Sequence, residues 1–256
     1  MIADTAKIHA TAKIGANVQI GDYSIIGEDV VIGDNSIIGP HVVIQGPTKI
    51  GKENHIFQFA SIGEAPQDKK HQGEKTRLEI GDRNVFREFT TISRGTAQGG
   101  GLTKIGNDNL FMAYVHIAHD CVVDNFVTFS NNASLAGHVH VYDHANLGGF
   151  VGVHQFCSIG AYSFCAGGSI IVKDVMPYLM VSGHPAQEYG LNLVGLKRHD
   201  FSEETLLTLK RAYKIIFRQG LTLEHALQKL SEMVKECVAI EPMIEFAKGV
   251  KRGIVR

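Results

Sequence analysis

The strongest constraint on the fold of this chain is an aliphatic residue that returns at every sixth position. The first unbroken run contains Ile8, Ile14, Ile20, Ile26, Ile32, Ile38, Ile44, Ile50, Ile56 and Ile62. The phase resumes at Ile80, Phe86 and Ile92, and a third run contains Ile105, Phe111, Ile117, Val123, Phe129, Leu135, Val141, Leu147, Val153, Ile159, Cys165 and Ile171. Six residues are too few for a helix and a turn, so each repeat is expected to form a short strand and a turn.

A small or β-branched residue lies two positions before most of these anchor residues, as at Val18, Ser24 and Val30. Side chains two positions apart on a strand point to the same side, so both are expected to point inward. Three such sides close a triangular coil of about 18 residues, and parallel hydrogen bonding stacks coils about 5 Å apart. The sequence therefore predicts a parallel β-helix of roughly eight to ten coils over residues 1–176.

Glycine often follows the anchor residue, as at Gly15, Gly21, Gly27 and Gly33, and Asp or Asn tends to come next. These residue types tolerate a positive φ, so we expect the turns to use that conformation here.

Three of the four cysteines fall on inward positions of the repeat: Cys121, Cys157 and Cys165. We therefore interpret them as interior hydrophobic residues rather than reactive thiols. The four cysteines show no CxxC spacing, which argues against a zinc knuckle or a disulfide framework and fits a reducing compartment.

Two segments interrupt the repeat, residues 64–78 and residues 93–104. They are expected to project as loops from corners of the rod, where binding and catalytic residues are often found. After about residue 175 the period ends, and residues 177–256 are predicted to form a linker and a small helical domain. Ser202 is the expected N-cap of its first helix, a second helix follows Thr222, and a third covers about 241–249.

Charge and hydropathy limit the classes of function. No apolar stretch approaches the 18 residues of a membrane span, and the N-terminus lacks a leader pattern, so a soluble, cytoplasmic protein is expected. Residues 1–196 carry 13 Lys and Arg against 18 Asp and Glu, whereas residues 197–256 carry 12 against 8. This basic tail is either a solvated helical face or a docking surface for an acidic partner. It lacks the aromatic residues and motifs of nucleic-acid binding.

Four of the thirteen histidines are brought together by the repeat. Ile117, Leu135 and Val153 are 18 residues apart and should stack on one side of the rod. Four histidines lie within three positions of these anchors and should share one edge: His116, His119, His138 and His154.

Three interpretations of this cluster remain open. The histidines are exposed turn residues, or three of them hold a zinc ion, or one neutral imidazole acts as a general base. Asp120 follows His119 directly and could fix its tautomer. The corresponding functions are a structural solenoid, a zinc-dependent hydratase of the carbonic anhydrase kind, and a group-transfer enzyme.

Several stretches resemble the bacterial UDP-N-acetylglucosamine O-acyltransferases, the family of the first step of lipid A biosynthesis. They are the hexapeptide rod, HIAHD (116–120), NNASLAGHVHV (131–141), GVHQF (152–156) and GLNLVGLKR (190–198). The resemblance covers essentially the whole chain. It implies an all-β left-handed parallel β-helix with a small C-terminal α-helical domain, assembled as a homotrimer with active sites between subunits.

The resemblance also implies a reaction and its residues. A 3-hydroxyacyl chain passes from acyl carrier protein to the glucosamine 3-hydroxyl of UDP-N-acetylglucosamine, with no cofactor and no metal. His119 is the implied general base, Asp120 orients it, and the backbone N–H of Gly137 stabilises the oxyanion. The implied substrate-binding residues are His116, His138, His154, Gln155, Asp68, Lys70, Asn192 and Arg198. For Asp68, Lys70, Asn192 and Arg198, the alternative interpretation is that they are ordinary polar residues of the surface. Acyl carrier protein is acidic, which would give the basic tail a partner.

Gly167 matches the position that sets acyl length in this family, where a larger side chain shortens the acyl pocket. By that analogy we expect a chain of about fourteen carbons. The sequence departs from the family pattern at Ser93, Val194, His199 and His184–Pro185. These departures affect sugar and nucleotide contacts, and leave open whether the acceptor carries a hydroxyl or an amine at carbon 3.

Overall fold

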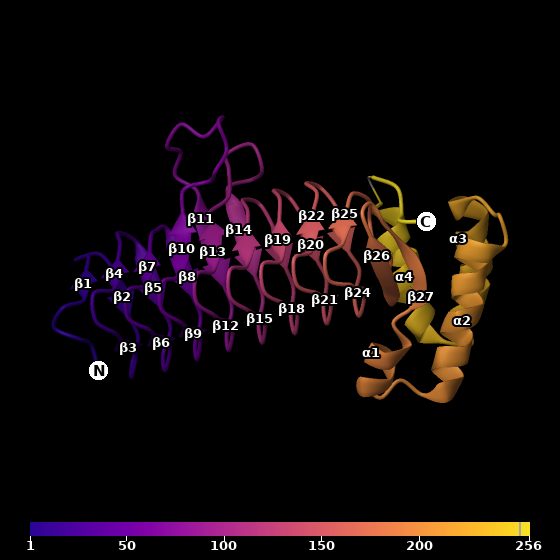
Figure 1. Ribbon diagram of the computed structural model, residues 1–256, viewed down its shortest axis with the longest axis horizontal. Helices are drawn as coiled ribbons and strands as arrows, with labels where there is room; N and C mark the ends of the chain where they lie inside the picture. Colours follow the sequence, from indigo (N-terminus) through magenta and orange to yellow (C-terminus); the bar gives the residue numbers. More distant parts are fainter. Residues whose placement is uncertain (251) are drawn as a thin grey trace.

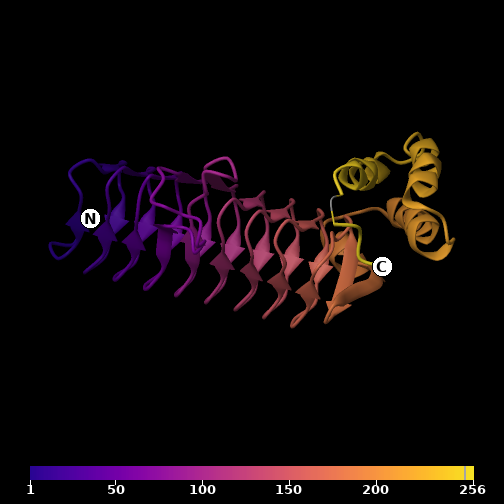
Figure 2. The ribbon, with the colours of Figure 1, turned by 90° about the horizontal axis from the view of Figure 1, so that it is seen from above.

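The computed structural model describes residues 1–250 and 252–256. A long rod of stacked coils makes up most of the molecule, and a group of helices lies at its C-terminal end (Figure 1). Figure 2 shows the helices gathered to one side of the rod end. None of the helices in the described residues is both long enough and apolar enough to cross a membrane.

Three sheets form the three sides of the rod, and up to Ile171 each receives every third strand of the chain in parallel orientation. The first sheet has nine strands: β1 (Lys7–Ile8), β4 (Ile25–Ile26), β7 (Val43–Ile44), β10 (Ser61–Glu64), β13 (Thr91–Ser93), β16 (His116–Ile117), β19 (Ser134–Leu135), β22 (Gly152–Val153) and β25 (Ile170–Ile171). The second has eight: β2 (Lys13–Ile14), β5 (Val30–Ile32), β8 (Thr48–Ile50), β11 (Arg77–Ile80), β14 (Leu102–Ile105), β17 (Val122–Val123), β20 (His140–Val141) and β23 (Ser158–Ile159). The third has ten: β3 (Gln19–Ile20), β6 (Ile37–Ile38), β9 (His55–Ile56), β12 (Val85–Phe86), β15 (Leu110–Phe111), β18 (Thr128–Phe129), β21 (Asn146–Leu147), β24 (Phe164–Cys165), β26 (Leu179–Gly183) and β27 (Ala186–Leu191).

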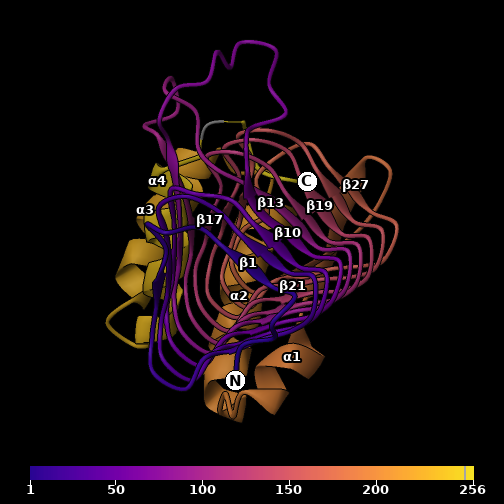
Figure 3. The ribbon, with the colours of Figure 1, turned by 90° about the vertical axis from the view of Figure 1, so that its left-hand side faces the viewer.

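The coil winds left-handed, as the view along the rod from its N-terminal end shows (Figure 3). Parallel crossovers are usually right-handed, so this handedness could not be inferred from the repeat itself. Nine strands in the first sheet agree with the predicted eight to ten coils. The all-β left-handed helix with a small C-terminal helical region is thus confirmed.

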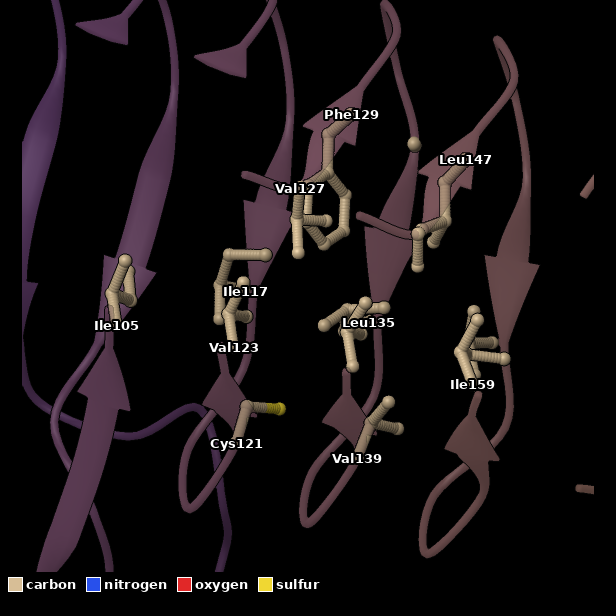
Figure 4. Packing of buried hydrophobic residues seen from close by; sticks show 14 of the residues in the cluster. Ile105, Ile117, Cys121, Val123, Val127, Phe129, Leu135, Val139, Leu147 and Ile159 are labelled. Atoms are coloured by element: carbon tan, nitrogen blue, oxygen red, sulfur yellow. The ribbon is translucent and has the colours of Figure 1, made fainter. Parts of the chain in front are cut away.

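The anchor residues form the core of the rod, with Ile44, Ile56 and Ile117 fully buried. Figure 4 shows successive anchors pointing into the same interior column. Three core phenylalanines stack one coil apart: the Phe86 and Phe111 rings are 4.8 Å apart, and the Phe111 and Phe129 rings 5.1 Å apart. Stacked rings of this kind add to the free energy gained from burial.

The inward cysteines are buried as predicted. Burial raises the pKa of the Cys121 and Cys165 thiols to about 12 and that of Cys157 to about 11. At neutral pH these thiols stay protonated, so they act as small hydrophobic residues.

The prediction about the turn glycines is wrong. The positive φ occurs three positions after the anchor, at residues such as Asn17 (57°) and Asn35 (58°). Gly15 and Gly33 are needed for a different reason, the close approach of the next coil. A Cβ on Gly15 would lie 2.7 Å from the Asp34 nitrogen, and one on Gly33 would lie 2.5 Å from the Gly51 carbonyl carbon.

Both interruptions project from the middle of the rod (Figure 1). The ends of the first interruption belong to strands β10 and β11, so the first loop consists of residues 65–76. The second loop consists of residues 94–101, between β13 and β14. The Arg94 side chain ties the loop bases to the rod, because its Nη1 donates hydrogen bonds of 2.8 Å to the carbonyls of Gly46 and Gly63.

The expected linker after residue 176 is instead an antiparallel hairpin. Strand β26 pairs with β24 in the third sheet and with β27 on its other side. The helices that follow are α1 (Leu193–Arg198), α2 (Glu203–Arg218), α3 (Leu223–Met233), the short 3₁₀ helix η1 (Val238–Ile240) and α4 (Glu241–Lys248). Ser202 and Thr222 cap α2 and α3 as predicted, whereas α1 was not anticipated. The boundary between the two regions stays a prediction.

The C-terminal segment returns to the end of the rod. The Asp174 N–H donates to the Gly253 carbonyl and the Val255 N–H donates to the Asp174 carbonyl, each at 2.9 Å. Residues 253–255 therefore cover backbone groups at the last turn of the rod.

Replacing Phe111 with alanine should lower the free energy of unfolding by about 3–5 kcal/mol, because it leaves a cavity between two stacked rings. Chemical denaturation measures the change. Leu207→Ala on α2 is the control: Leu207 is 59% exposed, so its loss should cost under about 1 kcal/mol. Equal losses for the two variants would contradict the assignment of the core.

Candidate functional site

The corner between the first and second sheets, below the two loops, brings together three of the predicted site residues. His119 and Asp120 follow β16, and His138 follows β19 one coil further on. The Nδ1 of His119 lies 2.8 Å from Oδ2 of Asp120, and Nε2 of His138 lies 3.6 Å from the same oxygen. The two imidazole rings meet edge to face, with centroids 5.3 Å apart. The predicted carboxylate–histidine contact is therefore present.

The Asp120 side chain is only 1% exposed, and the second loop supplies its hydrogen bonds. The backbone N–H of Thr96 donates to Oδ1 at 2.8 Å, and the Thr96 hydroxyl donates to Oδ2 at 2.6 Å. The Asp120 N–H in turn donates to Oγ1 of Thr103 at 2.8 Å. A buried carboxylate needs such donors, since burying an unpaired charge is costly. Neither threonine was predicted.

Gly137 lies directly against the His119 ring. A Cβ at this position would lie 2.5 Å from Cε1 and 2.9 Å from Nε2 of His119, closer than side-chain contacts allow. Among the described residues, the Gly137 N–H has no hydrogen-bond acceptor. The absence of a side chain at Gly137 thus leaves the space that the His119 ring occupies.

The other two histidines of the cluster lie close by. The Nδ1 of His116 is 2.7 Å from the hydroxyl of Thr91, and His154 Nδ1 is 3.1 Å from the carbonyl oxygen of Gln155. His154 and Gln155 are exposed, whereas His116 is half-buried.

Burial lowers the pKa of two of these imidazoles. For His116 desolvation is the main cause and His119 adds to it. For His138 desolvation again dominates, while Asp120 and, more weakly, Asp68 oppose it by raising the pKa. Both rings are therefore neutral at pH 7.

A groove of about 400 Å³ runs from this cluster along the outer face of the first sheet. His116 and His154 border it, and its lining includes Ala118, Ala136, Ile170 and Val172. Position 152 lacks a side chain, and a Cβ there would lie 3.1 Å from Ile170. The groove is mainly apolar and reaches four strands, from β16 to β25.

Asn192 and Arg198 lie elsewhere on this chain. They line a cavity of about 620 Å³ between α1 and the third sheet, together with Phe126, His144 and Tyr162. Asn192 caps α1 by accepting from the Gly195 N–H at 3.1 Å, and its amide donates to the Tyr162 carbonyl at 3.0 Å. None of the four clustered histidines lines this cavity.

Three further predicted residues lie outside the linings of the groove and the cavity. Asp68 and Lys70 lie in the first loop, where Oδ1 of Asp68 accepts from the Lys70 N–H at 2.9 Å. Gly167 lies in the turn before β25, at the opposite edge of the first sheet from His119, and a Cβ there would lie 3.3 Å from the Gly149 carbonyl oxygen.

The positions that depart from the family pattern differ in environment. Ser93 is buried at the end of β13, while Val194 is exposed at the rim of the cavity. The His199 ring meets those of His144 and Tyr162 edge to face. Val194 and His199 therefore alter the cavity that holds Asn192 and Arg198.

His119, Asp120 and His138 are also the one candidate metal cluster within residues 1–250 and 252–256. Their donor atoms lie within 4.8 Å of one another. The Asp120 oxygen of this set already accepts from Thr96 and His119, so a metal would have to displace those donors.

Two family models match separate parts of the chain, and full-length relatives cover all of it. Residues 11–46 match the model of bacterial transferase hexapeptide repeats, and residues 174–255 match that of UDP N-acetylglucosamine O-acyltransferase, domain 2. An acyl-[acyl-carrier-protein]–UDP-N-acetylglucosamine O-acyltransferase of Thiobacillus denitrificans is 53% identical over 255 residues, covering 100% of this chain and 99% of that protein. The same named enzyme of Halorhodospira halophila is 52% identical over 255 residues, with equal coverage.

A solved structure agrees with these relatives. The UDP-N-acetylglucosamine O-acyltransferase of Moraxella catarrhalis superposes with a TM-score of 0.99 at 48% identity, covering 100% of this chain and 99% of the other. The chain therefore belongs to the acyl-[acyl-carrier-protein]–UDP-N-acetylglucosamine O-acyltransferase family.

Proposed function

We propose that this acyltransferase moves a 3-hydroxyacyl group from acyl carrier protein to the glucosamine 3-hydroxyl of UDP-N-acetylglucosamine, the first step of lipid A biosynthesis. The observation that carries the proposal is the 2.8 Å contact between His119 Nδ1 and the buried Asp120 carboxylate. The carboxylate keeps the proton on Nδ1, which leaves the Nε2 lone pair free to accept one from a hydroxyl.

The reaction is a single acyl transfer. His119 Nε2 takes the proton of the 3-hydroxyl as its oxygen attacks the thioester carbonyl carbon. The Gly137 N–H donates to the oxyanion that forms. The intermediate then collapses, the carbon–sulfur bond breaks, and the leaving sulfur receives the proton from His119. Asp120 stays ionised throughout and holds the imidazolium.

The mainly apolar groove on the first sheet suits the hydrocarbon part of the donor. It begins at His116 beside His119 and extends toward the C-terminal end of the rod. We assign the substrate contacts near the reacting atoms to His116, His138, His154 and Gln155, and those of the first loop to Asp68 and Lys70. Gly167, in the turn before β25, is the proposed limit of acyl length.

We propose that the enzyme is a homotrimer with active sites shared between subunits. On one chain, Asn192 and Arg198 line a cavity against the third sheet, whereas His119 lies at the corner of the first and second. A nucleotide held by the first pair reaches His119 most simply if the two come from neighbouring subunits. Val194 and His199 at the cavity rim would then modify nucleotide recognition.

The basic tail is the proposed surface for acyl carrier protein. Several of its cations are already paired, as in Lys197 with Glu203, Arg211 with Glu236 and Arg218 with Glu188. Among the described residues, the exposed Lys210 and Lys214 of α2 form no salt bridge, so both can contact an acidic protein.

No cofactor is part of the proposal, because the thioester donor supplies the activated acyl group. A cytoplasmic location is also proposed, and the unpaired, buried cysteines fit a reducing compartment.

Replacing His119 with alanine should lower acyl transfer about 100-fold or more, because the reaction loses its base. The assay uses UDP-N-acetylglucosamine with 3-hydroxyacyl carrier protein, and denaturation midpoints check the fold. Chelator treatment of the unmodified protein should leave the rate unchanged. Undiminished transfer by the folded variant, or stoichiometric zinc lost together with activity, would refute the proposed base.

Mixed trimers of His119→Ala and Arg198→Ala should recover activity that neither variant has alone, because some clefts would pair an intact His119 with an intact Arg198. Co-expression with two different tags allows purification of the mixed species. If mixed trimers are no more active than the two parents, the site is not shared in this way.

Acyl length preference should favour chains of about fourteen carbons, and Gly167→Met should shift it toward shorter ones by filling the end of the acyl site. Competition between 3-hydroxyacyl carrier proteins of graded length measures the preference. A native preference for ten carbons would overturn the assignment of Gly167.

A further inference from the structure

The second loop reaches the catalytic pair through one side chain, that of Thr96. Thr96 is 2% exposed, and it is the residue whose backbone N–H and hydroxyl both bind the Asp120 carboxylate. No other side chain outside the histidine cluster donates to that carboxylate among the described residues. The loop thus binds both carboxylate oxygens of Asp120.

Hydrogen-bond directions around Thr96 are fixed by its neighbours. The Gly99 N–H donates to Thr96 Oγ1 at 3.1 Å, so this oxygen is an acceptor there. The hydroxyl proton then points to Asp120 Oδ2, 2.6 Å away, because an ionised carboxylate can only accept. The result is a chain of donors from Gly99 through Thr96 to Oδ2 of Asp120, the oxygen that His119 Nδ1 also contacts, at 2.8 Å.

Gly99 allows the loop to close over the carboxylate. A Cβ at this position would lie 2.1 Å from Cγ and 2.3 Å from Oδ2 of Asp120. The loop backbone is therefore packed against the side chain that orients the base, and the hydroxyl of Thr96 has little freedom to move.

We propose that Thr96 is a positioning residue for acyl transfer, holding the Asp120 carboxylate so that Oδ2 receives the Nδ1–H of His119. The inference rests on the proposed role of His119 and adds a function for the second loop. Without the Thr96 hydroxyl, Oδ2 would lose one of its two close donors, and the carboxylate could rotate away from the imidazole. Groups that support a catalytic contact in this way affect the transition state more than substrate binding.

Thr96→Val tests the proposal because valine keeps the shape and removes the hydroxyl. It should lower kcat about 10- to 100-fold, as expected for a lost hydrogen bond to a charged group, and change KM for UDP-N-acetylglucosamine by less than about 2-fold. Thr96→Ser should restore most of kcat. An unchanged kcat in folded Thr96→Val, or a loss that serine does not repair, would overturn the proposal.

Thr76→Val is the matched control in the neighbouring loop. Thr76 is also buried, at 4% exposure, but its Oγ1 has no hydrogen-bond partner among the described residues, so this change should leave kcat unaltered.

A double-mutant comparison separates positioning from general loop damage. In an Asp120→Ala background, Thr96→Val should lower kcat by less than about 2-fold, because the carboxylate it holds is absent. The same large loss in both backgrounds would contradict the proposal. If Thr96→Val does not fold, Thr96→Ala enters the same comparison with the same criteria. Loss of activity in His119→Ala with none in Thr96→Val would refute only the role of Thr96, whereas an active His119→Ala would refute the base itself.

Discussion

Parallel hydrogen bonding between coils is the interaction on which the rest of this structure depends. It places residues one turn apart at the same position around the rod, separated by one strand spacing of about 4.8 Å. His116 on β16 is thereby paired with Ser134 on β19, and Ser134 with Gly152 on β22. The outer face of the first sheet is a column of such positions. Small residues in that column leave the space that forms the groove.

The same regularity explains how two adjacent residues can form a catalytic pair. Asp120 and His138 occupy the equivalent corner position and have φ values of 60° and 61°. This left-handed conformation turns the Asp120 side chain back toward His119, which neighbouring residues of an extended strand cannot achieve. A positive φ raises the conformational free energy of a non-glycine residue. This cost is not special to the site, since nearly every coil has such residues at its corners.

The repeat made the rod and the histidine cluster predictable, because a fixed period turns residue numbers into positions. It said nothing about Thr96, since the residues of a loop have no phase relative to the coil, and the role of Thr103 on β14 depends on the contact that its side chain makes with the Asp120 N–H. The glycine prediction failed because local preference was considered without the neighbouring coil, which approaches Gly15 closely. The hairpin of β26 and β27 could not be predicted from the repeat, because the period ends at about residue 175 and no comparable pattern replaces it. The separation between His119 and the cavity lined by Asn192 depends on which sides of the rod the two segments occupy. Neither the HIAHD stretch nor the GLNLVGLKR stretch contains that information.

The returning C-terminal segment has a consequence for solubility. A parallel β-helix ends in exposed backbone donors and acceptors, and two such ends could join into a filament. Here Gly253 and Val255 bind the backbone of Asp174, and the β26–β27 hairpin extends the third sheet with a strand of opposite direction. At this end of the rod an incoming third sheet would therefore meet an antiparallel strand instead of a parallel one. Residues 253–255 and the β26–β27 hairpin thus limit the end-to-end association of a self-complementary architecture.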